Sequence, residues 1–163
     1  MIGNGGAGPA NSICDVPGIR VGSAEDDPLR TGVTVVLPEA PAVAACDVRG
    51  GGPGTRETEA LSPDTTVTQA HAVVLSGGSA LGLGAGDAVA AALSAQGVGL
   101  QVRPGHPPVP IVPAAILYDL TERAAAAFAA DGPPHPRLAR AALAAAQEGR
   151  PAAEGSVGAG RGA

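Results

Sequence analysis

The stretch HAVVLSGGSALGLGAGDAVAAALSAQG, residues 71–97, indicates the fold class. Residues 71–75 are a short apolar run typical of a buried strand, and the SGG sequence at 76–78 predicts a tight turn. Ser79 suits the N-cap of a helix, and Gly97 is a typical residue to end that helix. A strand, a glycine turn and a helix in this order predict a mixed α and β domain.

Three glycines, Gly82, Gly84 and Gly86, lie inside the predicted helix. Each costs about 0.5–1 kcal/mol of helix stability relative to alanine. Because several such losses occur in one helix, we expect another part of the backbone to pack very close to it.

The rest of the chain has shorter signals. Runs with β character predict strands at four places: residues 19–21, 31–37, 41–48 and 98–102. Residues 111–120 are apolar and mostly extended, after a proline-rich loop at 104–110. These elements alternate with the helix predicted above, as expected for an α/β (α+β) domain.

Two further segments complete the prediction. The glycine- and proline-dense segment 49–57 interrupts regular structure, with a short helix beginning near Thr55, and an alanine-rich helix covers 136–147. Residues 1–12 are glycine-rich and expected to be disordered, and residues 13–163 are expected to form a single domain.

The composition predicts a core of small side chains. The chain has 163 residues, of which 45% are hydrophobic, but it has one tyrosine, one phenylalanine and no tryptophan. At roughly 25 cal/mol per Å² of buried apolar surface, alanine and valine stabilise a fold weakly. We therefore expect stabilisation by a partner chain or subunit, although a coding bias toward alanine would produce the same composition.

Charge and residue usage exclude several function classes. The net charge is −5 and the sequence forms no basic stripe, which argues against nucleic-acid binding. No apolar run reaches the ~18–20 residues of a membrane span, and the N-terminus does not resemble a signal peptide. Neither the two cysteines nor the three histidines have metal-site spacing. We expect a cytoplasmic protein with no metal, no cofactor, no membrane contact and no nucleic-acid partner.

The glycine turn allows a second interpretation, a phosphate-binding loop. The sequence LSGGSALGLG at 75–84 does not match the pattern GxxxxGK[ST], the chain has no lysine, and no acidic residue is placed for a ribose. A turn that allows close strand–helix packing is the preferred interpretation. In a third possibility, the N–H groups of Gly77, Gly78 and Ser79 line a pocket.

A second glycine-dense bend carries charged side chains on both sides: Asp47, Arg49, Arg56, Glu57 and Glu59. An ion-paired scaffold is favoured over a site that holds a substrate carboxylate or amine.

The residue pattern does not reveal a complete catalytic set. No GxSxG nucleophile elbow is present, and Ser79 lies in the wrong sequence frame for one. His71, at a strand start, is expected to be structural, and Cys46, expected in mid-strand, to be inert.

Six stretches together resemble one family. They are NSICDVPGIRVG (11–22), TGVTVVLPE (31–39), CDVRGGGPGTRETEAL (46–61), VVLSGGSALGLGAGDAV (73–89), VPIVPAAILYDL (109–120) and AAEGSVGAGRGA (152–163). In this order they resemble the N-terminal, α-chain part of the P1 peptidases (peptidase family S58). That family includes the DmpA-like L-aminopeptidase/D-esterases, the β-aminopeptidases and the nylon-oligomer hydrolases. The resemblance covers Asn11 to Ala163.

The resemblance implies a fold and an activity. The fold is an αββα layered sandwich of the DmpA type, incomplete in this chain. Family members release N-terminal amino acids from small peptides, amides or esters. Their precursor cuts itself before a Ser or Thr, which becomes the N-terminal nucleophile of a β chain. Homo-oligomers, typically tetramers of αβ units, are implied as well.

The resemblance also concerns the end of the chain. In the family, a segment similar to GSVGAGRGA (155–163) is followed by a KGGxG run and then by the nucleophile. The resemblance thus implies that the nucleophile and the β chain lie beyond residue 163 and that this chain alone is inactive. The alternative is a truncated, non-catalytic paralogue that acts as a binding protein or has no function.

The resemblance gives this chain pocket and oxyanion-hole residues and no catalytic nucleophile. Tyr118 is a candidate hydrogen-bond donor to an oxyanion, with a buried structural aromatic as the alternative. Ser156 and Gly158 are expected to approach the active centre, and Gly77, Gly78 and Ser79 are candidates for pocket lining. Arg161 departs from the family pattern, because many relatives have a small or hydroxyl residue there.

Overall fold

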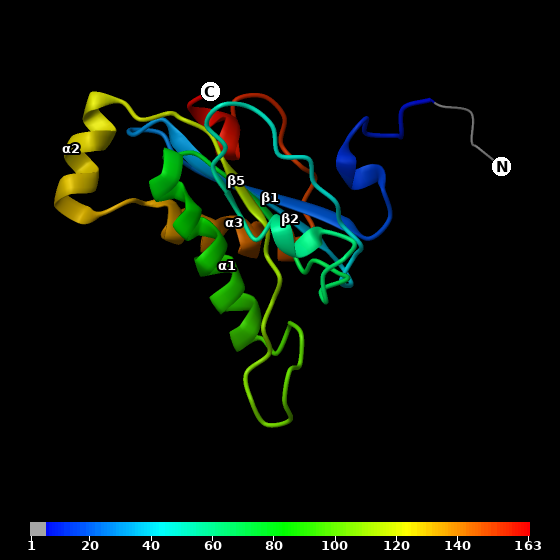
Figure 1. Ribbon diagram of the computed structural model, residues 1–163. Coiled ribbons are helices and arrows are strands. Elements are labelled where there is room, and N and C mark those ends of the chain that lie inside the picture. Colours follow the sequence, from blue (N-terminus) through cyan, green and yellow to red (C-terminus); the bar gives the residue numbers. More distant parts are fainter. Residues whose placement is uncertain (1–5) are drawn as a thin grey trace.

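The computed structural model describes residues 6–163 and shows one sheet with helices packed on it (Figure 1). The five strands are β1 (Ile19–Asp26), β2 (Thr31–Pro38), β3 (Thr55–Arg56), β4 (Val73–Ser76) and β5 (Ala114–Ile116). The α-helices are α1 (Gly84–Ala95), α2 (Glu122–Asp131) and α3 (His135–Glu148). The short 3₁₀ helices are η1 (Ile13–Asp15), η2 (Glu59–Leu61), η3 (Ser79–Leu83) and η4 (Gly158–Arg161).

The sheet is mixed, with strand order β1-β2-β4-β5-β3. Among the strands of residues 6–163, β4 and β5 are parallel and the other three pairs are antiparallel. Because β4 and β5 run in the same direction, Ser76 and Ile116 end them side by side. This common end of the two parallel strands is where polar side chains gather.

The core lies between one face of the sheet and the helices α1 and α3, which Figure 1 shows on the same side of the strands. Val33, Val35 and Val74 supply the sheet side of this core, and Leu93 and Leu143 supply the helix side. The helices approach closely because the facing side chains are mostly alanine and valine. Small side chains therefore contribute little stabilisation per buried residue, but they allow the helices to pack close to the sheet.

The opposite face of the sheet is less covered. Ser23, Thr34 and Leu75 lie in register across β1, β2 and β4 on this face, and η4 contacts its first two strands. Leu75 is 42% exposed although it lies in a central strand. Residues 6–163 thus form one sheet with helices packed on one face, which confirms the α+β class.

Two predicted strands are wrong. Residues 41–48 are irregular apart from a single bridge between Ala42 and Ala70, and Val43 is 83% exposed. Residues 98–102 likewise form one bridge, between Leu100 and Val109. Both runs have β propensity, but within residues 6–163 neither has a neighbouring strand to supply hydrogen bonds and burial. The helix α2 has no counterpart among the elements predicted from the sequence.

The predicted N-cap is also wrong. Ser79 is the first residue of η3 with φ +54°, it follows Gly78 at φ +84°, and α1 begins only at Gly84. The reason is tertiary, because the Ser79 N–H donates to the Leu117 carbonyl beyond β5 and holds the backbone away from a helical entry.

The expected close approach of another backbone is confirmed at Gly82, whereas Gly86 lies close to side chains and Gly84 makes an ordinary contact with Pro136. A Cβ at position 82 would collide with the Gly77 carbonyl, and one at position 86 would touch Arg56 and Ala114.

The structure describes only part of the N-terminal segment 1–12, which was expected to be disordered. Residues 1–5 of the segment expected to be disordered lie outside the described residues. In the described part, the N–H groups of Ala10 and Ser12 donate to the Asp15 carboxylate. No helix in residues 6–163 has the length and apolarity that crossing a bilayer would require.

Candidate functional site

Three buried polar side chains meet at the end of the parallel strand pair. The Thr31 hydroxyl, at the start of β2, donates to Asp119 Oδ2 at 2.6 Å and lies 2.9 Å from His135 Nε2. The exposed fractions are 1% for Thr31, 7% for Asp119 and 0% for His135. Since the single hydroxyl proton is donated to Asp119, His135 must donate its Nε2–H to the Thr31 oxygen. The chain of hydrogen bonds therefore runs from His135 through Thr31 to Asp119.

The glycine turn is bound to the same carboxylate. The Gly78 N–H donates to Asp119 Oδ1 at 2.6 Å, the Gly77 N–H donates to Gly32 O at 2.9 Å, and the Ser79 N–H donates to Leu117 O at 3.0 Å. Gly77 and Gly78 are buried. All three donors are satisfied inside the protein, so this arrangement supports a packing turn rather than a phosphate-binding loop.

His135 is held as a neutral ring. Its Nδ1 is buried and has no hydrogen-bond partner among the described residues, and Phe128 packs edge-on against the ring at a centroid distance of 5.6 Å. Burial lowers the pKa of His135, against the opposing charges of Asp119 and Asp26. Burial lowers the pKa of His71 as well.

The lowered pKa of His135 and of His71 predicts that the stability of the protein depends on pH. Below an unfolded-state pKa of about 6.5, the unfolded chain takes up protons that the buried rings do not, so the free energy of unfolding decreases as the pH falls. The slope is at most about 1.4 kcal/mol per pH unit for each histidine. Urea unfolding at pH values from 7.5 to 5.5 measures it.

His135→Gln should flatten this dependence, since a glutamine amide can still donate to Thr31. His106→Gln, at an exposed position, is the matched control. If the free energy of unfolding of His135→Gln depended on pH as steeply as that of the wild type, burial of the neutral His135 ring would be ruled out as a cause of the dependence.

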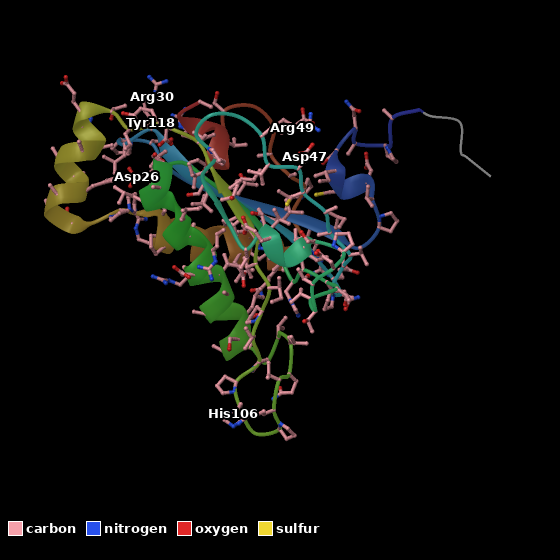
Figure 2. All side chains as sticks on the ribbon, viewed as in Figure 1. Asp26, Arg30, Asp47, Arg49, His106 and Tyr118 are labelled. Atoms are coloured by element: carbon pink, nitrogen blue, oxygen red, sulfur yellow. The ribbon has the colours of Figure 1, made fainter. Side chains whose placement is uncertain are left out.

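Tyr118 and Asp119 point in opposite directions. Tyr118 is 74% exposed and Asp119 is 7% exposed, although the two are neighbours in the chain. The alternative that Tyr118 is a buried structural aromatic is therefore wrong. Figure 2 shows Tyr118 at the same end of the molecule as Asp26 and Arg30.

The C-terminal segment reaches the same region. The Gly158 N–H donates to Glu25 Oε1 and the Ala159 N–H donates to Thr34 Oγ1 at 3.1 Å, which fixes η4 on β1 and β2. Arg161 Nε donates to Asp27 Oδ1 at 2.7 Å. A Cβ at Gly162 would collide with the Arg30 carbonyl and the Asp119 side chain, so the backbone passes directly over Asp119.

The sequence profile of peptidase family S58 matches residues 11–163. The chain belongs to peptidase family S58. Membership places it among peptidases, which are hydrolases. A search of curated proteins gave no match. The S58 match includes Tyr118, Asp119 and the C-terminal segment, the parts of the chain that the structure brings together.

Ser156 and Ser79 occupy different places in this S58 chain. Ser156 is exposed and lies two residues before the start of η4. Ser79 is half-buried behind the turn. Of the candidates from sequence, Gly78 bonds directly to Asp119, Gly77 lies against it, and Tyr118 is its neighbour in the chain. Ser156 and Gly158 lie on the segment that leads to Gly162, which packs over Asp119.

Charged side chains at the glycine-dense bend 49–57 pair with other groups of the protein. Arg56 pairs with Asp87 of α1, and Glu57 Oε2 accepts a hydrogen bond from the Val112 N–H at 3.0 Å. Arg49 and Asp47, both labelled in Figure 2, pair with each other at 2.6 Å on an exposed loop. These contacts support the ion-paired scaffold.

Two other candidates from the sequence have ordinary surroundings. His71 Nδ1 accepts a hydrogen bond from the Ile111 N–H at 3.0 Å, a structural contact. Cys46 is exposed in an irregular segment, so the mid-strand placement is wrong. A cavity of about 390 Å³ is lined in part by His71, Arg20 and Leu93, and neither Tyr118 nor Asp119 lines it.

Sequence reasoning missed Thr31, Asp119 and His135. One signal was present, because Asp119 directly follows the apolar run ending at Tyr118, where a carboxylate must find partners if it is buried. Nothing in the sequence identified those partners, since they lie 88 and 41 positions away along the chain.

Proposed function

We propose that this S58 chain is the α-chain part of an aminopeptidase or amidase that releases N-terminal amino acids from peptides, amides or esters. The nucleophile is a Ser or Thr made N-terminal by autoproteolysis, outside residues 11–163. The observation that carries the proposal is that the backbone of Gly162 lies against Asp119, the residue next to Tyr118, within a chain that matches a peptidase family along this length.

The hydroxyl groups of the described residues support a nucleophile from elsewhere. Among residues 6–163, Thr31 is the hydroxyl residue bonded to both an imidazole and a carboxylate. It is 1% exposed, and its proton is already donated to Asp119, so a substrate carbonyl cannot reach it. A nucleophile must lie within contact distance of the carbonyl it attacks.

In this proposal, Tyr118 donates its phenol O–H to the oxyanion of the tetrahedral intermediate. Its exposure suits this role, since the group must meet a substrate. Ser156 and Gly158 lie on the segment that leads toward the nucleophile and line the substrate site. The reaction needs no cofactor, because the nucleophile's own amine serves as the base.

The second chain is proposed to cover the less protected face of the sheet. Leu75 is 42% exposed in the middle of that face, which is apolar surface available to a partner. A β chain packed there would complete the αββα layers, and αβ units would assemble into a cytoplasmic homo-oligomer, a tetramer.

Intact mass of the protein purified natively from its source tests the proposal. Two chains, the smaller beginning with Ser or Thr, are the expected result. A single species of 15.6 kDa would overturn it and would favour a non-catalytic paralogue. As a second measurement, the pure 163-residue chain should not hydrolyse an aminoacyl p-nitroanilide, and turnover by it would contradict an external nucleophile.

A further inference from the structure

Asp119 contacts three separate parts of the candidate site. Its carboxylate accepts hydrogen bonds from Thr31 at the start of β2 and from the Gly78 N–H of the turn after β4. Its side chain also lies under the backbone of Gly162. Tyr118 is its neighbour in sequence.

The partners of Asp119 leave it little freedom. A buried carboxylate is tolerated only where hydrogen bonds replace its hydration, and both oxygens here accept a short bond of 2.6 Å. Thr31 is fixed in turn by His135 at the start of α3. The carboxylate is therefore held in one orientation by three separate elements.

That orientation determines where Tyr118 points. Because the two residues are consecutive, the hydrogen bonds that hold Asp119 inward also fix the backbone from which the Tyr118 ring extends outward. The observed exposed fractions, 7% for Asp119 and 74% for Tyr118, match this coupling. The same carboxylate supports the C-terminal segment through Gly162.

We propose that Asp119, held by Thr31 and His135, is a positioning residue that aligns Tyr118 with the C-terminal segment for the reaction. The inference rests on the proposed function for its catalytic consequence. The other half of the inference, that the buried hydrogen-bond chain determines the orientation of the Tyr118 ring, does not depend on the proposed function and is tested separately.

The single tyrosine allows a direct test on the chain itself. Incorporated 3-fluorotyrosine labels Tyr118 alone, so the ¹⁹F spectrum reports its environment. Thr31→Val removes the hydroxyl with little change in volume, and Asp119→Asn replaces one acceptor oxygen with a donor. Both should shift or split the single resonance. Thr31→Ser keeps the hydroxyl and should restore it.

A core variant on the same strand controls for general destabilisation. Val35→Ala lies outside the hydrogen-bond chain and should keep the wild-type resonance. All variants are compared under conditions in which circular dichroism shows them folded. An unchanged resonance in folded Thr31→Val and Asp119→Asn, or the same change in Val35→Ala, would overturn the inference.

The catalytic consequence is tested in the natively processed enzyme. Thr31→Val should lower kcat about 10- to 100-fold with little change in KM, because misplacing a catalytic group by about 1 Å has an effect of this size. In a Tyr118→Phe background, Thr31→Val should have almost no further effect.

The two proposals fail differently. Additive losses in the double variant would overturn positioning through Tyr118 while leaving the proposed function intact. A Tyr118→Phe enzyme with wild-type kcat would instead remove the oxyanion role on which the proposed function relies.

Discussion

Replacing Gly22 with alanine is expected to disrupt the packing of β1 on α3. A Cβ at position 22 would collide with the Ala142 carbonyl and the Ala146 N–H, both backbone atoms inside α3. Backbone atoms of a helix cannot rotate away as a side chain does, so the strand and the helix would have to separate.

We expect this substitution to lower the free energy of unfolding by about 3 kcal/mol or more, the upper end of overpacking effects. A domain of ordinary stability has only about 5–15 kcal/mol in total. Urea unfolding followed by circular dichroism measures the loss.

Gly51→Ala is the matched control for this prediction. No atom of the described residues lies within 4 Å of a Cβ at that position, so the expected change is within about 0.5 kcal/mol. If Gly22→Ala unfolded at the wild-type urea midpoint, the close approach of β1 and α3 would be refuted.

Tyr118→Phe is expected to lower kcat of the natively processed enzyme by about 100- to 1,000-fold, the effect of removing one oxyanion donor. The substitution removes only the phenol O–H and keeps the ring. Because Tyr118 is 74% exposed, the variant should keep the wild-type stability. Steady-state kinetics with an aminoacyl p-nitroanilide measures kcat, with KM expected to change little.

His106→Ala controls for substitution at an exposed position. Figure 2 shows His106 at the end of the molecule far from Tyr118, so this variant should retain kcat. A kcat within threefold of wild type for Tyr118→Phe would exclude the phenol as an oxyanion donor.

The regular elements that could be predicted from the sequence are those whose signals are local. Residues 31–37 form a β-branched run, and the observed strand is Thr31–Pro38. The alanine-rich run at 136–147 is helical over His135–Glu148. Residues 41–48 have a similar β composition, but a strand also needs a partner, and in the part of the chain that the structure describes no neighbouring strand pairs with them along their length.

Only some residues of the candidate site could be predicted from the sequence. Tyr118 and Ser156 were found through the family resemblance, whereas Asp119, Thr31 and His135 were not singled out. An aspartate is usually an exposed residue, so its identity alone gives no reason to place it in a core. Burial is a property of the packed structure.

The sequence by itself determined the family, the α+β class and the position of the glycine turn. Family motifs, hydrophobic patterns and glycine conformations act over short stretches of chain, so they can be recognised without coordinates. The tertiary structure alone decided that Thr31, Asp119 and His135 form one buried hydrogen-bond chain and that Tyr118 faces outward. The physical reason is that a buried polar group must find its partners in space, and here Thr31 lies 88 positions from Asp119 and 104 positions from His135.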